Sequence, residues 1–105
     1  MQKTVINLNN KELLLNERLY TDFSLSVRRM LIDLYHAGFD FPTTIKGTQA
    51  QVESFMKALS TEKRYMDAYM KYGLGDSRTM MSKYELSRAV NGFERETGLR
   101  WPFKN

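Results

Sequence analysis

The sequence predicts a mainly α-helical fold, a compact bundle of four to five helices, with a minor two-stranded β element from residues 4–8 and 42–46 as an optional addition. Three observations predict it. Apolar side chains recur at helical spacing along much of the chain, and glycines follow several of these segments. A length of 105 residues suits one hydrophobic core, so we expect a single domain over residues 1–105. A helix-dominated α+β fold is the alternative.

The first residues predict a short strand and then a short helix. Residues 4–8, TVINL, alternate weakly and include β-branched side chains, which favours a strand. Asn10 is a good N-cap for a helix that runs to Tyr20 and carries leucines on one side. Residues 21–24 are expected to break this helix.

A second helix is expected between Ser24, a good N-cap, and Gly38, which suits a left-handed stop. Its apolar side chains have the i, i+3, i+4, i+7, i+8 spacing of one helical face. They are Val27, Met30, Leu31, Leu34 and Tyr35. The helix is therefore expected to be amphipathic and to pack one face on the core.

Residues 42–46 and the segment after them predict a strand followed by a helix. Pro42 forces extended backbone on the residue before it, and the β-branched residues 43–45 favour a strand that pairs with residues 4–8. Thr48 and Gln51 have the spacing of a capping box, which predicts a helix through Leu59.

Residues 60–73, STEKRYMDAYMKYG, predict the central helix of the fold. Ser60 can cap its start and Gly73 can end it, so we expect a kink or a break near Ser60. At about 100° per residue its apolar side chains cover an arc of roughly 200°. A helix with so wide an apolar face is expected to be buried on two sides.

The C-terminal third predicts a loop, a long helix and an aromatic tail. Residues 74–81 show no periodicity and are expected to form a long loop. Ser82 and Glu85 have capping-box spacing and Gly98 suits a helix stop, which predicts a helix over residues 83–97. The tail that follows holds Trp101 and Phe103, and is too aromatic to be merely a solvent tail.

Charge and composition restrict the function. The formal net charge of +4 and the pI near 9.4 permit contact with nucleic acid or with an acidic partner. Without cysteine the chain has neither a disulfide framework nor a thiolate zinc site, which fits a reducing compartment. Nothing in the sequence resembles a signal peptide or a membrane span, so we expect a cytoplasmic protein.

The sequence shows no pattern typical of catalysis or of metal binding. His36 is the single histidine, and Asp33 is placed to orient it as a general base, but the end of a helix favours a structural role for a basic side chain. The carboxylates match neither a calcium-binding loop nor a zinc-protease motif. We therefore expect no catalytic residue, no metal and no cofactor, and a protein that is not an enzyme.

Two groups of side chains are candidates for binding a macromolecule. The first joins the tyrosines of residues 60–73 to the aromatic tail, and consists of Tyr65, Tyr69, Met70, Tyr72, Trp101 and Phe103. Because methionines lie beside these tyrosines, packing against other helices is the simpler interpretation. Any part of this apolar arc that stays exposed is expected to bind a protein.

The second group is basic, and consists of Arg28, Arg29, Tyr84, Arg88, Asn91 and Arg95. The last four share one face of the expected C-terminal helix, and Arg and Asn suit phosphates and base edges. A two-helix DNA reader has a shorter turn than the one expected here, so a plain solvent-facing surface is the simpler interpretation.

The sequence thus predicts a small non-enzymatic protein-interaction or regulatory module that binds a protein partner or forms a homodimer. The alternative is a nucleic-acid-binding accessory protein that uses the basic face of its C-terminal helix.

Overall fold

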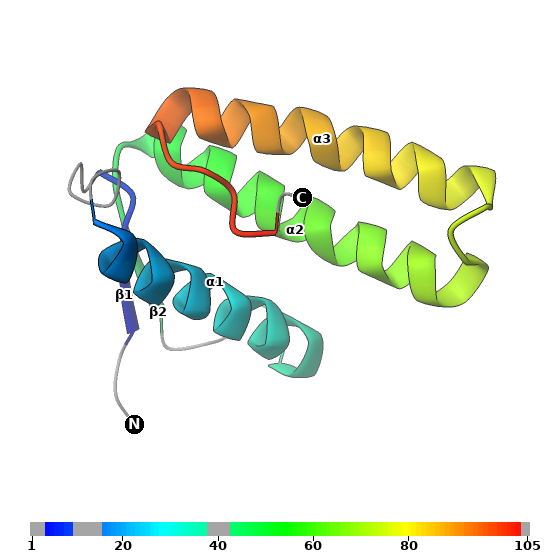
Figure 1. Cartoon of the computed structure of the whole chain (residues 1–105), viewed down its shortest axis with the longest axis horizontal. Coiled ribbons are helices and arrows are strands. Elements are labelled where there is room, and N and C mark those ends of the chain that lie inside the picture. The colour runs from blue at the N-terminus through cyan, green and yellow to red at the C-terminus, as the bar shows by residue number, and fades with distance from the viewer. Residues whose placement is uncertain (1–3, 10–15, 38–42, 104–105) are drawn as a thin grey trace.

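The computed structural model describes residues 4–9, 16–37 and 43–103. Figure 1 shows the order of elements: β1 (Thr4–Asn7), α1 (Glu17–Ala37), β2 (Thr43–Lys46), α2 (Gln49–Tyr72) and α3 (Ser77–Thr97). The fold is mainly helical and compact. The described residues form three helices, so the expected number of four to five is wrong.

The strands confirm the predicted β element, and they pair in parallel. Thr4 lies opposite Thr43 and Asn7 opposite Lys46, and the Leu8 N–H extends the ladder by donating to the Lys46 carbonyl at 2.8 Å. Parallel strands need a long crossover, and α1 lies in the connection between them.

The predicted break at residues 21–24 is wrong, because α1 runs through it without interruption. The Thr21 hydroxyl donates to the Glu17 carbonyl one turn earlier, at 2.8 Å, and Ser24 lies inside the helix. Asn16 precedes the helix and accepts from the Arg18 N–H at 3.0 Å, which is the role expected of Asn10. Asn10 and Gly38 lie outside the described residues.

One face of α1 is buried, as its predicted stripe requires. Val27, Met30 and Leu31 are at most 5% exposed, and Phe23 joins them one turn earlier at 6%. Phe23 lies within residues 21–24, so its packing on the core keeps the helix intact across the neighbouring hydroxyl residues. The side chains of Leu34 and Tyr35 lie outside the described part.

The predicted break near Ser60 is also wrong, because α2 is continuous over 24 residues. Ser60 and Thr61 do not cap a new helix; their hydroxyls donate back to the Lys57 carbonyl, at 3.2 and 2.6 Å. The predicted capping box at the start of α2 is confirmed. The Gln51 N–H donates to Thr48 Oγ1 at 3.1 Å, and the Thr48 N–H donates to Gln51 Oε1 at 2.9 Å.

The predicted start of α3 is wrong as well, because α3 begins at Ser77 with Asp76 as its N-cap. The expected loop over residues 74–81 is therefore only four residues long, from Gly73 to Asp76, and Ser82 lies inside the helix. The end of α3 confirms the prediction: Gly98 is left-handed, with φ 75° and ψ 0°, and its N–H donates to the Glu94 carbonyl at 2.8 Å.

The C-terminal tail fills the space between α1 and the antiparallel pair α2–α3 (Figure 1). Trp101 is 1% exposed and makes edge contacts with Phe55 and Phe93, at centroid distances of 6.0 and 5.2 Å. The Tyr20 hydroxyl of α1 donates to the Arg100 carbonyl at 2.6 Å. The tail thus holds α1 against the α2–α3 hairpin.

One end of the α2–α3 hairpin is not covered by the rest of the molecule. In Figure 1 the last turns of α2, the connecting loop and the first turns of α3 project past the end of α1 and past the tail. This projecting end carries the candidate functional site.

Candidate functional site

The turn at the end of the hairpin is fixed by local interactions. α2 ends at Gly73, whose φ of 85° and ψ of 168° belong to a region essentially restricted to glycine. Asp76 accepts from the Arg78 N–H at 2.8 Å and caps α3. The Arg78 guanidinium donates to both carboxylate oxygens of Asp76, at 3.0 Å each, and lies 3.5 Å from the centre of the Tyr72 ring.

Two further contacts join the helices near this turn. The buried Thr79 hydroxyl of α3 donates to the Ala68 carbonyl of α2 at 3.2 Å. Arg64 of α2 and Glu85 of α3 approach to 4.0 Å on the surface. The two helices are therefore held together up to the end of the hairpin.

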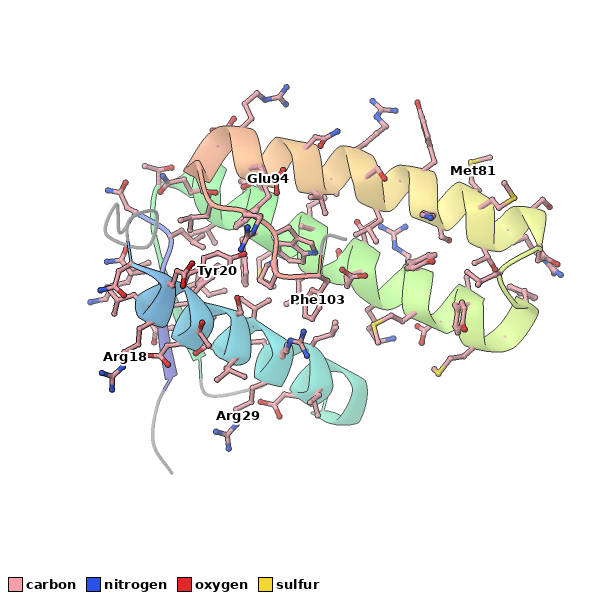
Figure 2. The ribbon with its side chains drawn as sticks, viewed as in Figure 1. Arg18, Tyr20, Arg29, Met81, Glu94 and Phe103 are labelled. Atoms are coloured by element: carbon pink, nitrogen blue, oxygen red, sulfur yellow. The ribbon has the colours of Figure 1, made fainter. Side chains whose placement is uncertain are left out.

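Large apolar side chains remain exposed on this end. Met70 is 69% exposed and Tyr69 47%. We call the whole group the hairpin-end surface, and it consists of Met66, Tyr69, Met70, Leu74, Met80, Met81 and Tyr84. Figure 2 shows Met81 on the outer side of α3 near the turn. Outside this segment, the described large apolar side chains with comparable exposure are Leu25 and Ile32 of α1.

The hairpin-end surface includes a concave region. A pocket of about 400 Å³ is lined by Tyr65 of α2, by Leu74 of the turn, and by side chains of α3 that include Met80, Lys83 and Tyr84. Most of these groups are apolar, and a mostly apolar pocket with a few polar groups is the usual form of a binding site.

Basic residues are concentrated in the same segment. Residues 63–84 hold five Lys or Arg and two Asp, a net charge of +3, whereas residues 1–62 hold seven basic and seven acidic residues. Two of the five make close ion pairs inside the segment, Lys63 with Asp67 at 2.9 Å and Arg78 with Asp76 at 3.0 Å. The apolar end of the hairpin thus carries most of the chain's net positive charge.

The structure separates the first predicted group into two parts. Tyr69 and Met70 are exposed on the hairpin end, Tyr65 is half-buried at its pocket, and Tyr72 is half-buried under Arg78. The other two lie between α1 and the hairpin. Trp101 is in the core, and Phe103 packs against it at a centroid distance of 5.8 Å, with Arg28 above its ring at 5.7 Å.

Sequence reasoning missed Leu74, Met80 and Met81, because residues 74–81 show no periodicity. The signal that would have found them is Asp76, which can cap a helix as well as Ser82 can. A helix begun at Asp76 places Met80 and Tyr84 one turn apart on the same side.

The second predicted group is also divided. Tyr84, Arg88, Asn91 and Arg95 are all exposed, and they lie on the face of α3 turned away from the core residue Phe93. Arg88 approaches the Tyr84 ring to 6.0 Å. Figure 2 shows Arg29 on the side of α1 away from the hairpin, so it does not join the α3 residues in one patch.

A second depression runs between α2 and α3. It measures about 880 Å³, and its lining includes four basic side chains, among them Arg88 and Arg95, and three acidic ones, among them Glu85. The nearly balanced charge gives it no strong preference for anions.

Glu62 is a buried carboxyl whose environment bears on a catalytic role. It is 6% exposed, and its burial raises the pKa of the carboxyl above the ordinary value, although the hydrogen bond from Trp101 lowers it. A carboxyl of raised pKa is typical of catalytic acids. Because its Oε1 accepts from Trp101 Nε1 within the core, at 2.9 Å, Glu62 holds the tail in place.

The described residues offer neither a metal site nor a membrane span. Among them, no cluster of three or more His, Asp or Glu side chains is placed to hold a metal ion. None of the three helices combines the length and apolar character that crossing a bilayer requires. The His36 side chain lies outside the described part.

Comparison with known proteins gives no relative from which a function can be transferred. The chain matches no protein-family model, no curated protein and no solved structure.

Proposed function

We propose that this chain is a non-enzymatic protein-interaction module and that it binds its partner through the hairpin-end surface. The observation that carries the proposal is the gathering of seven exposed large apolar side chains around one turn. Exposed apolar side chains that stand singly are ordinary, but a concentration of them at one end of a molecule marks an interaction site.

The rigidity of the turn supports a binding role. Asp76, Arg78 and Tyr72 form one stacked and hydrogen-bonded unit, and Thr79 joins the two helices beside it. A surface that is already ordered loses less conformational entropy when a partner binds. Four of its seven side chains are methionines, which adapt their shape to a partner surface.

A photo-crosslinking amino acid at position 70 tests the proposal in cells that express the chain. We expect a covalent adduct with a specific protein, whose identity mass spectrometry gives and whose binding is then measured with both proteins purified. The matched control is the same amino acid at position 32, because Ile32 is 57% exposed on α1. Equal adducts at both positions, or none at position 70, would refute the proposal.

The outer face of α3 favours a second candidate function, in which the chain binds nucleic acid. Arg88, Asn91 and Arg95 are exposed on one face beside the Tyr84 ring, a combination suited to phosphates and bases. For this candidate, binding to random DNA or RNA must weaken with salt, and Arg88→Ala must reduce the salt slope by about one. Arg29→Ala on α1 is the control. Absence of binding at low salt removes this candidate.

A further inference from the structure

The hairpin-end surface has features that indicate what kind of partner binds it. We propose that its occupant is an acidic amphipathic helix of a partner protein, packed against α2 where α1 and the tail no longer cover it. This inference rests on the proposed function and specifies the partner's chemistry.

The core-facing side of α2 continues into the hairpin end. Phe55 and Leu59 are fully buried, and Met66 and Tyr69 follow on the same side of the helix. At about 100° per residue these four side chains fall within roughly 80° of one another. The apolar stripe that is buried in the first half of α2 thus becomes exposed in the second half, where Met66 is 37% exposed and Tyr69 47%.

The shape of this end of the hairpin also suits a helix. Over its first half, this side of α2 packs against the tail and against α1 (Figure 1). In the second half of α2, no described element covers this side of the helix, which lies next to the pocket lined by Tyr65 and Met80. Two antiparallel helices present a groove that a third helix fills at an interaxial distance of about 8–10 Å. A partner helix would continue along α2 the packing that the chain's own elements begin.

The charge of the hairpin end favours an acidic partner. Residues 63–84 carry a net charge of +3, and Lys83, which lines the pocket beside this side of α2, is exposed. Acidic residues beside the apolar stripe of a partner helix would meet Lys83. In a helix-in-groove complex the apolar anchors supply most of the affinity, and the flanking charges select the partner and speed the encounter.

The same observations disfavour the other occupants. A second copy would bring together two ends that each carry +3, which opposes association. Single-stranded nucleic acid stacks on aromatic faces, whereas five of the seven exposed side chains are Met or Leu. An acidic helix satisfies both the apolar side chains and the charge.

Synthetic peptides of about 18 residues, long enough for appreciable helicity, provide the probes. One carries Leu and Met at the spacing of a helical face with Glu elsewhere, the second replaces Glu by Lys, and the third scrambles the order of the first. Binding to the full chain is measured by fluorescence anisotropy and stopped flow. We expect the Glu peptide to bind about tenfold or more tightly than the Lys peptide, a difference of about 1.4 kcal/mol, and the scrambled peptide not to bind.

Variants of the chain separate the contribution of the positive charges from that of the apolar side chains. Lys83→Glu is expected to slow association and reduce its salt dependence, because charges at the rim act mainly on the encounter. Lys71→Glu is its control, because Lys71 lies about 160° from Tyr69 around α2. Met70→Ser with Met80→Ser is expected to speed dissociation several-fold. Arg29→Glu and Ile32→Ser on α1 are matched controls and are expected to bind as the unchanged chain does. Circular dichroism verifies that each variant is folded.

The inference is overturned if the Lys or the scrambled peptide binds as well as the Glu peptide, or if the hairpin-end variants bind normally. It is also overturned if light scattering shows a dimer that Met70→Ser dissociates, or if a single-stranded oligonucleotide displaces the Glu peptide. A protein adduct at position 70 together with failure of the Glu peptide removes this inference and leaves the proposed function. Absence of an adduct at position 70 removes both the proposed function and this inference, because the inference rests on that function.

Discussion

Trp101 Nε1 donates a hydrogen bond to Glu62 Oε1 at 2.9 Å, with both side chains buried and 39 positions apart in the sequence. This contact joins the C-terminal tail to the middle of α2. The Trp101 backbone N–H donates at the same time to Glu94 Oε2 of α3, at 2.9 Å. The tail is thus bonded to both helices of the hairpin, and its indole fills the space between Phe55 and Phe93.

Glu62→Gln is expected to stabilise the protein at neutral pH. Burial raises the pKa of Glu62, so the folded state binds its proton more tightly than the unfolded state. Stability from this group is complete below the unfolded pKa of about 4.3 and falls as the pH rises through the folded pKa. Glutamine keeps an oxygen acceptor for Trp101 and removes the charge. Each unit by which the pKa is raised corresponds to about 1.4 kcal/mol.

Urea unfolding of the unchanged protein and of Glu62→Gln, from pH 4 to pH 8, measures this difference. The two free energies of unfolding are expected to be close at the acid end and to diverge as the pH rises, with the variant becoming the more stable protein. A difference that does not depend on pH would show that ionisation of Glu62 does not destabilise the folded state.

Asp76 is expected to give the opposite dependence on pH. The hydrogen bonds from Arg78 lower the pKa of Asp76 to about 2. A carboxyl with a lowered pKa stabilises the fold above its unfolded pKa of about 3.9, and this stability is lost as the pH falls toward 2. Asp76→Ala removes the cap of α3, so it is expected to destabilise at pH 7 and to have a much smaller effect near pH 2. Thermal unfolding at the two values measures it, with Asp67→Ala as the control because Asp67 pairs on the surface without capping a helix.

The parts of the fold that depend on neighbouring residues could be predicted from the sequence. The capping box at Thr48, the glycine stop at Gly98 and the two strands are set by side chains close to one another in the chain. The predicted breaks failed for a common reason. Hydroxyl residues such as Ser60 can cap a helix or bond back inside one, and packing on distant residues decides between the two.

The candidate site was predictable to a similar extent. The wide apolar arc of residues 60–73 placed Tyr69 and Met70 among the candidates, but its expected burial on two sides is wrong at these two residues, which are exposed. The burial of Trp101 was not predictable, since its pocket is made by Phe55, Phe93 and Glu62 from two other elements. The contribution of Met80 depended on whether Asp76 or Ser82 begins α3, and both residue types cap helices well.

Alanine at two glycines is expected to act in opposite directions. Gly92 lies inside α3 and an added Cβ would meet no atom within 4 Å, so Gly92→Ala should stabilise by up to about 1 kcal/mol. Gly73 has a φ of 85°, which side chains rarely adopt, so Gly73→Ala should destabilise by about 1–3 kcal/mol. Gly75→Ala is the control in the same turn, because its surroundings are open and its φ is not positive. If urea unfolding gives Gly73→Ala and Gly75→Ala the same change in free energy of unfolding, the backbone at Gly73 imposes no special requirement for glycine.

Trp101→Phe is expected to destabilise the protein more at pH 7 than at pH 4. Phenylalanine keeps most of the ring packing but lacks the Nε1–H, which leaves the buried Glu62 carboxyl without this donor. An unsatisfied buried group costs about 1–3 kcal/mol, and more when it is charged. Burial raises the pKa of this carboxyl, so a larger fraction of it is protonated at pH 4 than at pH 7, and the loss at pH 4 is smaller.

Phe103→Leu provides the matched control for this variant. Phe103 is half-buried against Trp101 and under Arg28, and its own side chain does not titrate. Leucine at position 103 removes only contacts of the Phe103 ring, so the loss of stability should be the same at pH 4 and pH 7. If Trp101→Phe also costs the same at both, ring packing explains the whole effect. If its cost grows with pH and the growth disappears in the Glu62→Gln background, the hydrogen bond to Glu62 is what couples the tail to α2.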